Sequence, residues 1–231
     1  MLDLDFTAVV NALPYLAKGM LFTLQVTLVA MIGGIFFGTL LALARLSGLA
    51  WLRNLAAAYV NLMRSIPLIL AIFWIFFLVP ELVAWLIGST EPVPLGTTVT
   101  AFVAFTIFEA AYFCEVIRAG IQSVAKGQNA AGRALGFTYV QNLRYVILPQ
   151  AFRAMIPVLL TQTIILFQDT SLLYVISATD FLGAASKVAQ RDGRLVEFYL
   201  FAAVVYFVIC FALSKFVRRF QARLNRNTLP V

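Results

Sequence analysis

No residue between Lys18 and Arg45 carries a charge, and this long apolar stretch constrains the fold more than any other feature of the chain. A bilayer core about 30 Å thick is crossed by about 20 apolar helical residues, so the stretch predicts a membrane-spanning helix. Of the 231 residues, 62% are hydrophobic and 12% are charged, against about 25% charged residues in an ordinary soluble domain. A water-soluble fold is nearly excluded.

Further charge-poor intervals predict four more spans, and therefore an all-α integral membrane fold. We expect the five spans, within a transmembrane domain of residues 19–216, at about 20–44, 54–80, 95–114, 154–176 and 198–214. Gly34 and Gly38 have the spacing that lets a neighbouring helix approach closely. Pro67 predicts a kink or a broken turn in the second span. No signal-peptide pattern precedes the first span, so we expect it to remain in the mature protein.

Lys and Arg residues are distributed unequally between the two sides that alternating spans define. Thirteen of the 17 fall on one side, within residues 45–64, 118–153 and 215–226. By the positive-inside rule, we expect an extracytoplasmic N-terminal segment (1–18), a cytoplasmic loop (120–150) and a basic cytoplasmic tail (217–231). The net charge of +7 is then a topology signal that requires no nucleic acid. We favour anionic lipid headgroups over a specific partner as the contact of the tail.

Several classes of chemistry lack the residues they need. Histidine is absent, which excludes the Ser-His-Asp triad and imidazole metal sites. Cys114 and Cys210 lie far apart in apolar stretches and are expected to be packing residues. The sequence has no GxxxxGK[ST] phosphate loop. We therefore expect no catalytic residue, no metal site and no cofactor bound by this chain.

The predicted cytoplasmic loop has an internal pattern of short helices. Residues 126–128 (Lys-Gly-Gln) are expected to break the preceding helix, and an Ala-rich helix then ends at Gly136. A second helical segment covers about 139–148, where Pro149 either stops it or starts the next span. A small Ala-rich helix fits closely into the groove of another protein. The alternative is a helical hairpin that lies on the membrane surface.

The same loop resembles the EAA loop of type I ABC importer permeases, whose pattern is Glu-Ala-Ala, three residues, Gly, nine residues, then Ile-x-Leu-Pro. Matching residues are Ala131, Gly136, Leu148 and Pro149. The Glu, second Ala and Ile positions hold Ala130, Gly132 and Val146. In that family this helix docks on a cytoplasmic ATPase. The resemblance implies ATPase coupling for Gly127, Ala130, Ala131, Gly132, Gly136, Leu148 and Pro149.

Three other segments resemble elements of the polar amino acid (His/Glu/Gln/Arg/opine) branch of these permeases. They read RSIPL at 64–68, EVIRAGIQSV at 115–124 and QDTSL at 168–172. Residues 167–171 and 191–193 also resemble one of the two permease subunits of glutamate/aspartate importers. Together the resemblances cover about residues 18–215. They imply the type I ABC importer permease fold and a place in the bacterial cytoplasmic (inner) membrane.

The family's division of labour implies the partners of this chain. They are a second permease subunit, identical or sibling, two ATPase subunits that use the ATP, and an extracytoplasmic amino acid binding protein, in addition to the lipid bilayer. The chain would then form the translocation path for polar amino acids, with glutamate and aspartate as the expected substrates. A stand-alone carrier or channel and a membrane anchor for a soluble partner are the alternative functions.

Three ionisable residues fall inside predicted spans, where a charge costs roughly 2.5 to 3.5 kcal/mol at a helix centre. They are Arg64, Glu109 and Asp169. Helical spacing puts Gln162 on the face of Asp169, with Thr161 and Gln168 beside them. We expect these six residues to line the substrate path, with Arg64 binding a carboxylate and Asp169 or Glu109 accepting from an ammonium group.

The alternative role for Arg64 is structural, in which it pairs with Glu109 or with backbone carbonyls and holds the helices together. A second open choice concerns residues 180–197, whose charges alternate in sign on the outer side. This segment is either a solvated cap or a contact surface for the binding protein.

Overall fold

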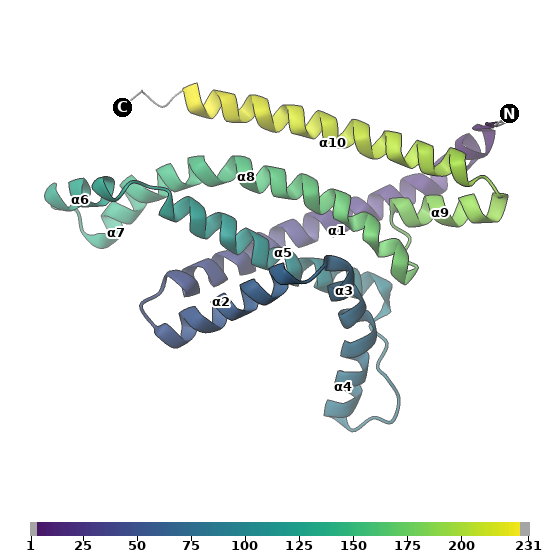
Figure 1. Ribbon diagram of the computed structural model, residues 1–231, viewed down its shortest axis with the longest axis horizontal. Coiled ribbons are helices and arrows are strands. Elements are labelled where there is room, and N and C mark those ends of the chain that lie inside the picture. The colour runs from purple at the N-terminus through teal and green to yellow at the C-terminus, as the bar shows by residue number, and fades with distance from the viewer. Residues whose placement is uncertain (1–3, 227–231) are drawn as a thin grey trace.

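The computed structural model describes residues 4–226, which fold into a bundle of helices with no strand among them (Figure 1). Within these residues five helical segments are long and apolar enough to cross a membrane, which confirms the predicted all-α fold with five spans. Residues 1–3 of the predicted N-terminal segment and 227–231 of the basic tail lie outside the described part. The five membrane-length segments are Thr7–Leu46, Leu68–Ile87, Gly96–Gln122, Tyr139–Ile176 and Leu195–Leu224.

Helices α1 (Thr7–Leu46) and α5 (Gly96–Gln122) form the centre of the bundle. A Cβ atom on Gly38 would lie 2.9 Å from the carbonyl oxygen of Ala110, and one on Gly34 would lie 2.8 Å from the ring of Phe113. The two helices therefore touch along the glycine face, as the spacing of these residues predicts. Helix α1 begins well before the predicted residue 20, because its first turns pack against α9 (Phe181–Asp192).

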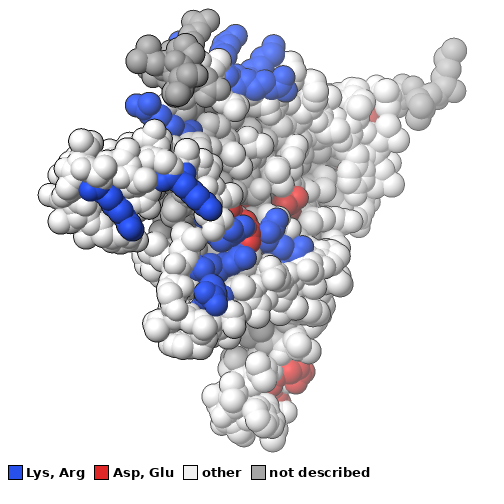
Figure 2. Space-filling view, turned by 60° about the vertical axis from the view of Figure 1, so that its left-hand side comes forward, with Lys and Arg blue, Asp and Glu red and all other residues white. Residues whose placement is uncertain are grey.

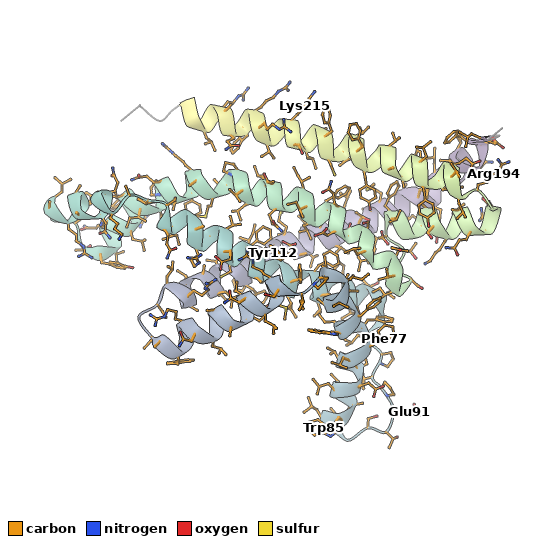
Figure 3. All side chains as sticks on the ribbon, viewed as in Figure 1. Phe77, Trp85, Glu91, Tyr112, Arg194 and Lys215 are labelled. Carbon is orange, nitrogen blue, oxygen red and sulfur yellow. The ribbon has the colours of Figure 1, made fainter. Side chains whose placement is uncertain are left out.

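The predicted second span, 54–80, is wrong in its boundaries. Helix α2 (Ala50–Ser65) ends before Ile66 and Pro67, which are both extended, because proline disfavours helical geometry in the residue before it. The membrane-length segment follows as α3 (Leu68–Phe73), a wider π-helical turn (Trp74–Leu78) and α4 (Val79–Ile87). Helix α4 projects from the bundle, with Trp85 76% exposed near its end (Figures 1 and 3).

The predicted cytoplasmic loop contains two short helices, α6 (Lys126–Ala134) and α7 (Tyr139–Asn142). The helix break falls at Ser123–Ala125, one turn before the predicted position, and residues 126–128 belong to α6. Gly136 ends the Ala-rich segment with φ of 81°, as predicted. A π-helical turn (Leu143–Ile147) and α8 (Leu148–Asp169) follow without a break, so Pro149 does not stop this segment, and the fourth membrane-length segment begins at Tyr139 rather than at the predicted residue 154.

A 3₁₀ segment (Thr170–Ile176) extends α8, and α9 (Phe181–Asp192) and α10 (Leu195–Arg226) complete the fold. The third and fifth spans are longer than predicted and reach Gln122 and Leu224. The start of α1 and α9 lie at one end of the bundle, and α6, α7 and the end of α10 lie at the other (Figure 1). Lys and Arg side chains gather on the face that looks toward this second end (Figure 2).

Candidate functional site

Glu109 on α5 is a carboxylate that the fold removes from solvent almost completely. Its residue is 1% exposed, and Gln162 on α8 donates a hydrogen bond from Nε2 to Glu109 Oε2 at 3.1 Å. The amide is the partner that a buried carboxylate needs, since an unpaired one would be strongly destabilising. The structure therefore brings together two of the six predicted path residues, from different spans.

Tyr112, one turn beyond Glu109, joins this pair to Arg64. The guanidinium carbon of Arg64 lies 5.5 Å from the centre of the Tyr112 ring, which is a cation–π contact. Figure 3 labels Tyr112 on α5. Asp169, at the end of α8, is half-buried and lies within electrostatic range of both Glu109 and Tyr112. Arg64, Glu109, Gln162 and Asp169 thus form one polar region between α2, α5 and α8, which we call the inner polar site.

Glu115 on α5 is the acidic centre of an adjoining ion-pair cluster. Arg45, at the end of α1, contacts it directly, and Arg118 Nη2 lies 2.6 Å from its Oε2. Arg64 Nη1 lies 3.7 Å from its Oε1, so Arg64 contacts Glu115 rather than Glu109. With three arginines on one carboxylate, the cluster carries excess positive charge. The sequence interpretation did not assign Glu115, Arg45, Tyr112 or Arg118 to the site, although the EVIR pattern places Glu115 and Arg118 one turn apart.

Arg64 is held more loosely than the other two arginines of the cluster. Its side chain is 43% exposed, against 15% for Arg45 and 27% for Arg118. A guanidinium that is partly exposed keeps N–H donors that can bind another carboxylate. The arrangement can therefore offer an arginine fork beside buried acidic groups, which is the chemistry that an amino acid zwitterion requires.

Thr161 and Gln168 lie on a different side of α8 from Gln162. They line a groove of about 300 Å³ between α8 and α10, together with Cys210, Ser214 and Arg218. The predicted polar stripe is thus divided between two surfaces, because Thr161 and Gln168 are offset by one residue from Gln162 and Asp169. Their assignment to the substrate path stays a prediction.

The predicted coupling residues lie at the end of the bundle that α6 and α7 form. Gly127, Ala130, Ala131, Gly136 and Pro149 are exposed, Leu148 is half-buried, and Gly132 is buried. A cation-bearing hollow on α6 is formed by Lys126, Asn129, Ala130 and Arg133. The exposed face of α6 is therefore available to a partner.

The opposite end of the bundle is formed by α9 and the start of α1. Asp180 is fully buried and caps α9 by accepting hydrogen bonds from the N–H groups of Leu182 and Gly183, at 3.0 and 3.3 Å. Burial raises the pKa of Asp180 to about 7. Lys187 Nζ donates hydrogen bonds to Ser177 O and Thr179 Oγ1. At least one of the charged residues in the segment 180–197 therefore stabilises local structure.

These features define a class: a five-span helical membrane protein with a polar site between its spans and an exposed helical hairpin at one end. A family model for binding-protein-dependent transport system inner membrane components matches residues 34–226. The chain belongs to this family. It is a multi-pass protein of the inner membrane and is homologous to the permease subunits of amino acid ABC importers.

Curated relatives and solved structures agree with this assignment. The chain is 48% identical over 223 residues to the glutamate/aspartate import permease protein GltK of Escherichia coli O6:H1, covering 96% of this chain and 99% of the relative. It is 37% identical to the probable glutamine ABC transporter permease protein GlnP of Bacillus subtilis, covering 91% and 94%. A crystal structure of an amino acid ABC transporter with histidines superposes with a TM-score of 0.87 at 30% identity, covering 96% of this chain and all of the other.

Proposed function

We propose that this chain is the permease subunit of an ATP-driven importer and forms, with a second permease subunit, the translocation path for glutamate and aspartate. The proposal is supported by the 48% identity to a glutamate/aspartate permease and by the chemistry of the inner polar site. The observation that carries it is the position of Arg64, whose half-exposed guanidinium lies 3.7 Å from Glu115 Oε1 and 5.5 Å from the centre of the Tyr112 ring.

An acidic amino acid presents two carboxylates and one ammonium group. Arg64 is placed to bind a carboxylate, and the half-buried Asp169 is placed better than the fully covered Glu109 to accept from the ammonium. Glu109, which is held in place by its hydrogen bond from Gln162, then provides an acidic group on one side of the site. Binding remains weak enough for release because Arg64 retains its contact with Glu115 as an alternative partner.

The same proposal assigns the remaining subunits. Two ATPase subunits hydrolyse ATP on the cytoplasmic side and dock on α6, and an extracytoplasmic binding protein delivers the substrate at the end formed by α9. The N-terminus lies outside and the C-terminus in the cytoplasm, since basic side chains gather toward the α6 end (Figure 2). This chain itself supplies no ATP-hydrolysing residue and binds no cofactor.

The role of Arg64 is tested by uptake into proteoliposomes that contain the complete importer. Arg64→Ala is expected to raise the half-saturating substrate concentration at least tenfold, with normal yield of the complex. Arg64→Lys restores the charge but not the fork, so only part of the affinity returns. Arg53→Ala, which removes an exposed arginine of the same helix, is the matched control.

Unchanged affinity and turnover in Arg64→Ala would exclude the substrate role. Loss of assembled complex in the same variant would support the structural role instead, because Arg64 would then hold α2 on α5.

A further inference from the structure

Asn142 is a buried polar side chain within a mostly exposed hairpin. It is 2% exposed, whereas Val140 and Tyr145 on either side of it are 68% and 63% exposed. Buried polar groups are retained where hydrogen bonds fix them, so the contacts of Asn142 show what it does.

The amide of Asn142 joins the two arms of the hairpin. Its Nδ2 donates to the backbone oxygen of Asn129 at 3.2 Å and to Asn129 Oδ1 at 2.7 Å. Asn129 lies on α6, thirteen residues earlier, and Asn142 is the last residue of α7. The side chain therefore spans from one arm to the other.

Gly132 is the residue that makes room for this amide. A Cβ atom at position 132 would overlap Asn142 Oδ1 and lie 2.8 Å from its Cγ. Atoms so close cannot coexist, and the amide cannot move away without losing its bonds to Asn129. Glycine at this position of α6 and asparagine at 142 are therefore a matched pair.

Asn142 is followed directly by the helical segment that reaches the inner polar site. Helical structure is continuous from Tyr139 to Ile176 and includes Gln162 and Asp169. On the other side, α6 is joined to this segment through a turn at Gly136 and through the amide of Asn142. A turn alone is a flexible joint, whereas a side chain bonded across the two arms fixes their relative position.

We propose that Asn142 is a positioning residue that fixes α6 on the start of the long helical segment, so that a displacement of α6 moves Gln162 and Asp169. The proposal rests on the proposed function, in which α6 receives the movement of the ATPase. Asn142 contacts neither the substrate nor the ATP, and it acts through α6 and α8.

The matched pair provides a double-mutant test in the full-length chain within the purified importer. Asn142→Ala and Gly132→Ala are each expected to increase the hydrogen-exchange rate of the α6 amides about tenfold, since each removes the bonds to Asn129. The double variant Gly132→Ala/Asn142→Ala is expected to exchange as Asn142→Ala does, because the added methyl group no longer meets an amide. Gln128→Ala, at an exposed position of the same helix, is the control for exchange.

The functional readout is substrate imported per ATP hydrolysed, measured with the amount of bound ATPase. For Asn142→Ala this ratio falls severalfold at an unchanged amount of bound ATPase, which a role in folding alone would not produce. Wild-type exchange in either single variant, additive effects in the double variant, or an unchanged ratio would overturn the proposal. If the wild-type chain binds no ATPase, the proposed function fails, and the exchange rates still decide whether Asn142 fixes α6.

Discussion

Gln162 Nε2 lies 3.1 Å from Glu109 Oε2, and this hydrogen bond joins α8 to α5 in the interior of the bundle. Glu109 is almost completely buried, so its oxygen atoms have little access to water. The bond therefore does two things: it satisfies a costly polar group and it sets the distance between two spans that bound the inner polar site.

Replacing Gln162 by Leu is expected to destabilise the protein by about 1–3 kcal/mol, because the Glu109 carboxylate loses its partner. Thermal unfolding in detergent measures this loss. The double variant Glu109→Leu/Gln162→Leu removes both partners and should recover much of the stability, since no buried polar group is left unpaired. A double variant that is less stable than Gln162→Leu would contradict this account.

Because α1 and α5 are in close contact at Gly38, a larger side chain at this position is expected to lower the stability of the protein strongly. A side chain there meets the backbone of Ala110 and Cys114 at 2.9 Å, and a backbone cannot rotate away. Gly38→Val is expected to destabilise the protein by about 1–3 kcal/mol or to reduce the amount of folded protein. Gly48→Ala, where a Cβ atom meets nothing within 4 Å, is the control and should be close to wild type.

ATPase docking is tested at Gly136. Its φ of 81° suits glycine, so any other residue strains the backbone, and an aspartate adds a charge at the proposed interface. Gly136→Asp is expected to reduce the ATPase that co-purifies with the importer by about tenfold or more. Gly136→Ala measures the contribution of strain alone, and Ala131→Asp adds the charge on α6 without strain.

Ala131→Asp should therefore also weaken the association, and Gly136→Ala should weaken it less than Gly136→Asp. Wild-type amounts of ATPase bound to both aspartate variants would show that α6 is not the docking helix.

Asp180 predicts a pH dependence of stability. Burial raises its pKa from 3.8 to about 7 in the folded protein, so the folded state holds the proton more tightly than the unfolded state. The resulting stabilisation is complete below about pH 4 and is lost as the pH rises through 7. Asp180→Asn cannot ionise, and its single side-chain oxygen can still accept one of the two hydrogen bonds at the start of α9. Melting temperatures from pH 5 to 8 should fall more for the wild type than for this variant, and parallel curves would contradict the assignment.

The sequence was sufficient for the number of spans, the close approach at Gly34 and Gly38, and the helix that ends at Gly136. These features depend on local composition and spacing, which a single chain displays directly. Pro67 predicted a kink or a broken turn in one span, and the structure has the break, but the separation of α2 from the span was not predicted. Apolar composition continues across the break, and only the extended conformation of Ile66 and Pro67 divides it.

The candidate site was predictable as a set of polar residues but not as an arrangement. Helical spacing placed Gln162 beside Asp169, yet the partner of Gln162 is Glu109 on another helix. Likewise Arg64 pairs with Glu115 rather than Glu109, because the angle at which α2 meets α5 decides which carboxylate lies within reach. Such contacts between distant segments depend on packing, which periodicity does not encode.

The central claim is that this chain imports acidic amino acids as part of an ATP-driven complex. The most direct measurement is uptake of a panel of radiolabelled amino acids by proteoliposomes that contain this chain, its partner permease, the ATPase and the binding protein. The account predicts accumulation of glutamate and aspartate that requires both ATP and the binding protein. Uptake by this chain alone without ATP, or ATP-dependent uptake that excludes glutamate and aspartate, would contradict it.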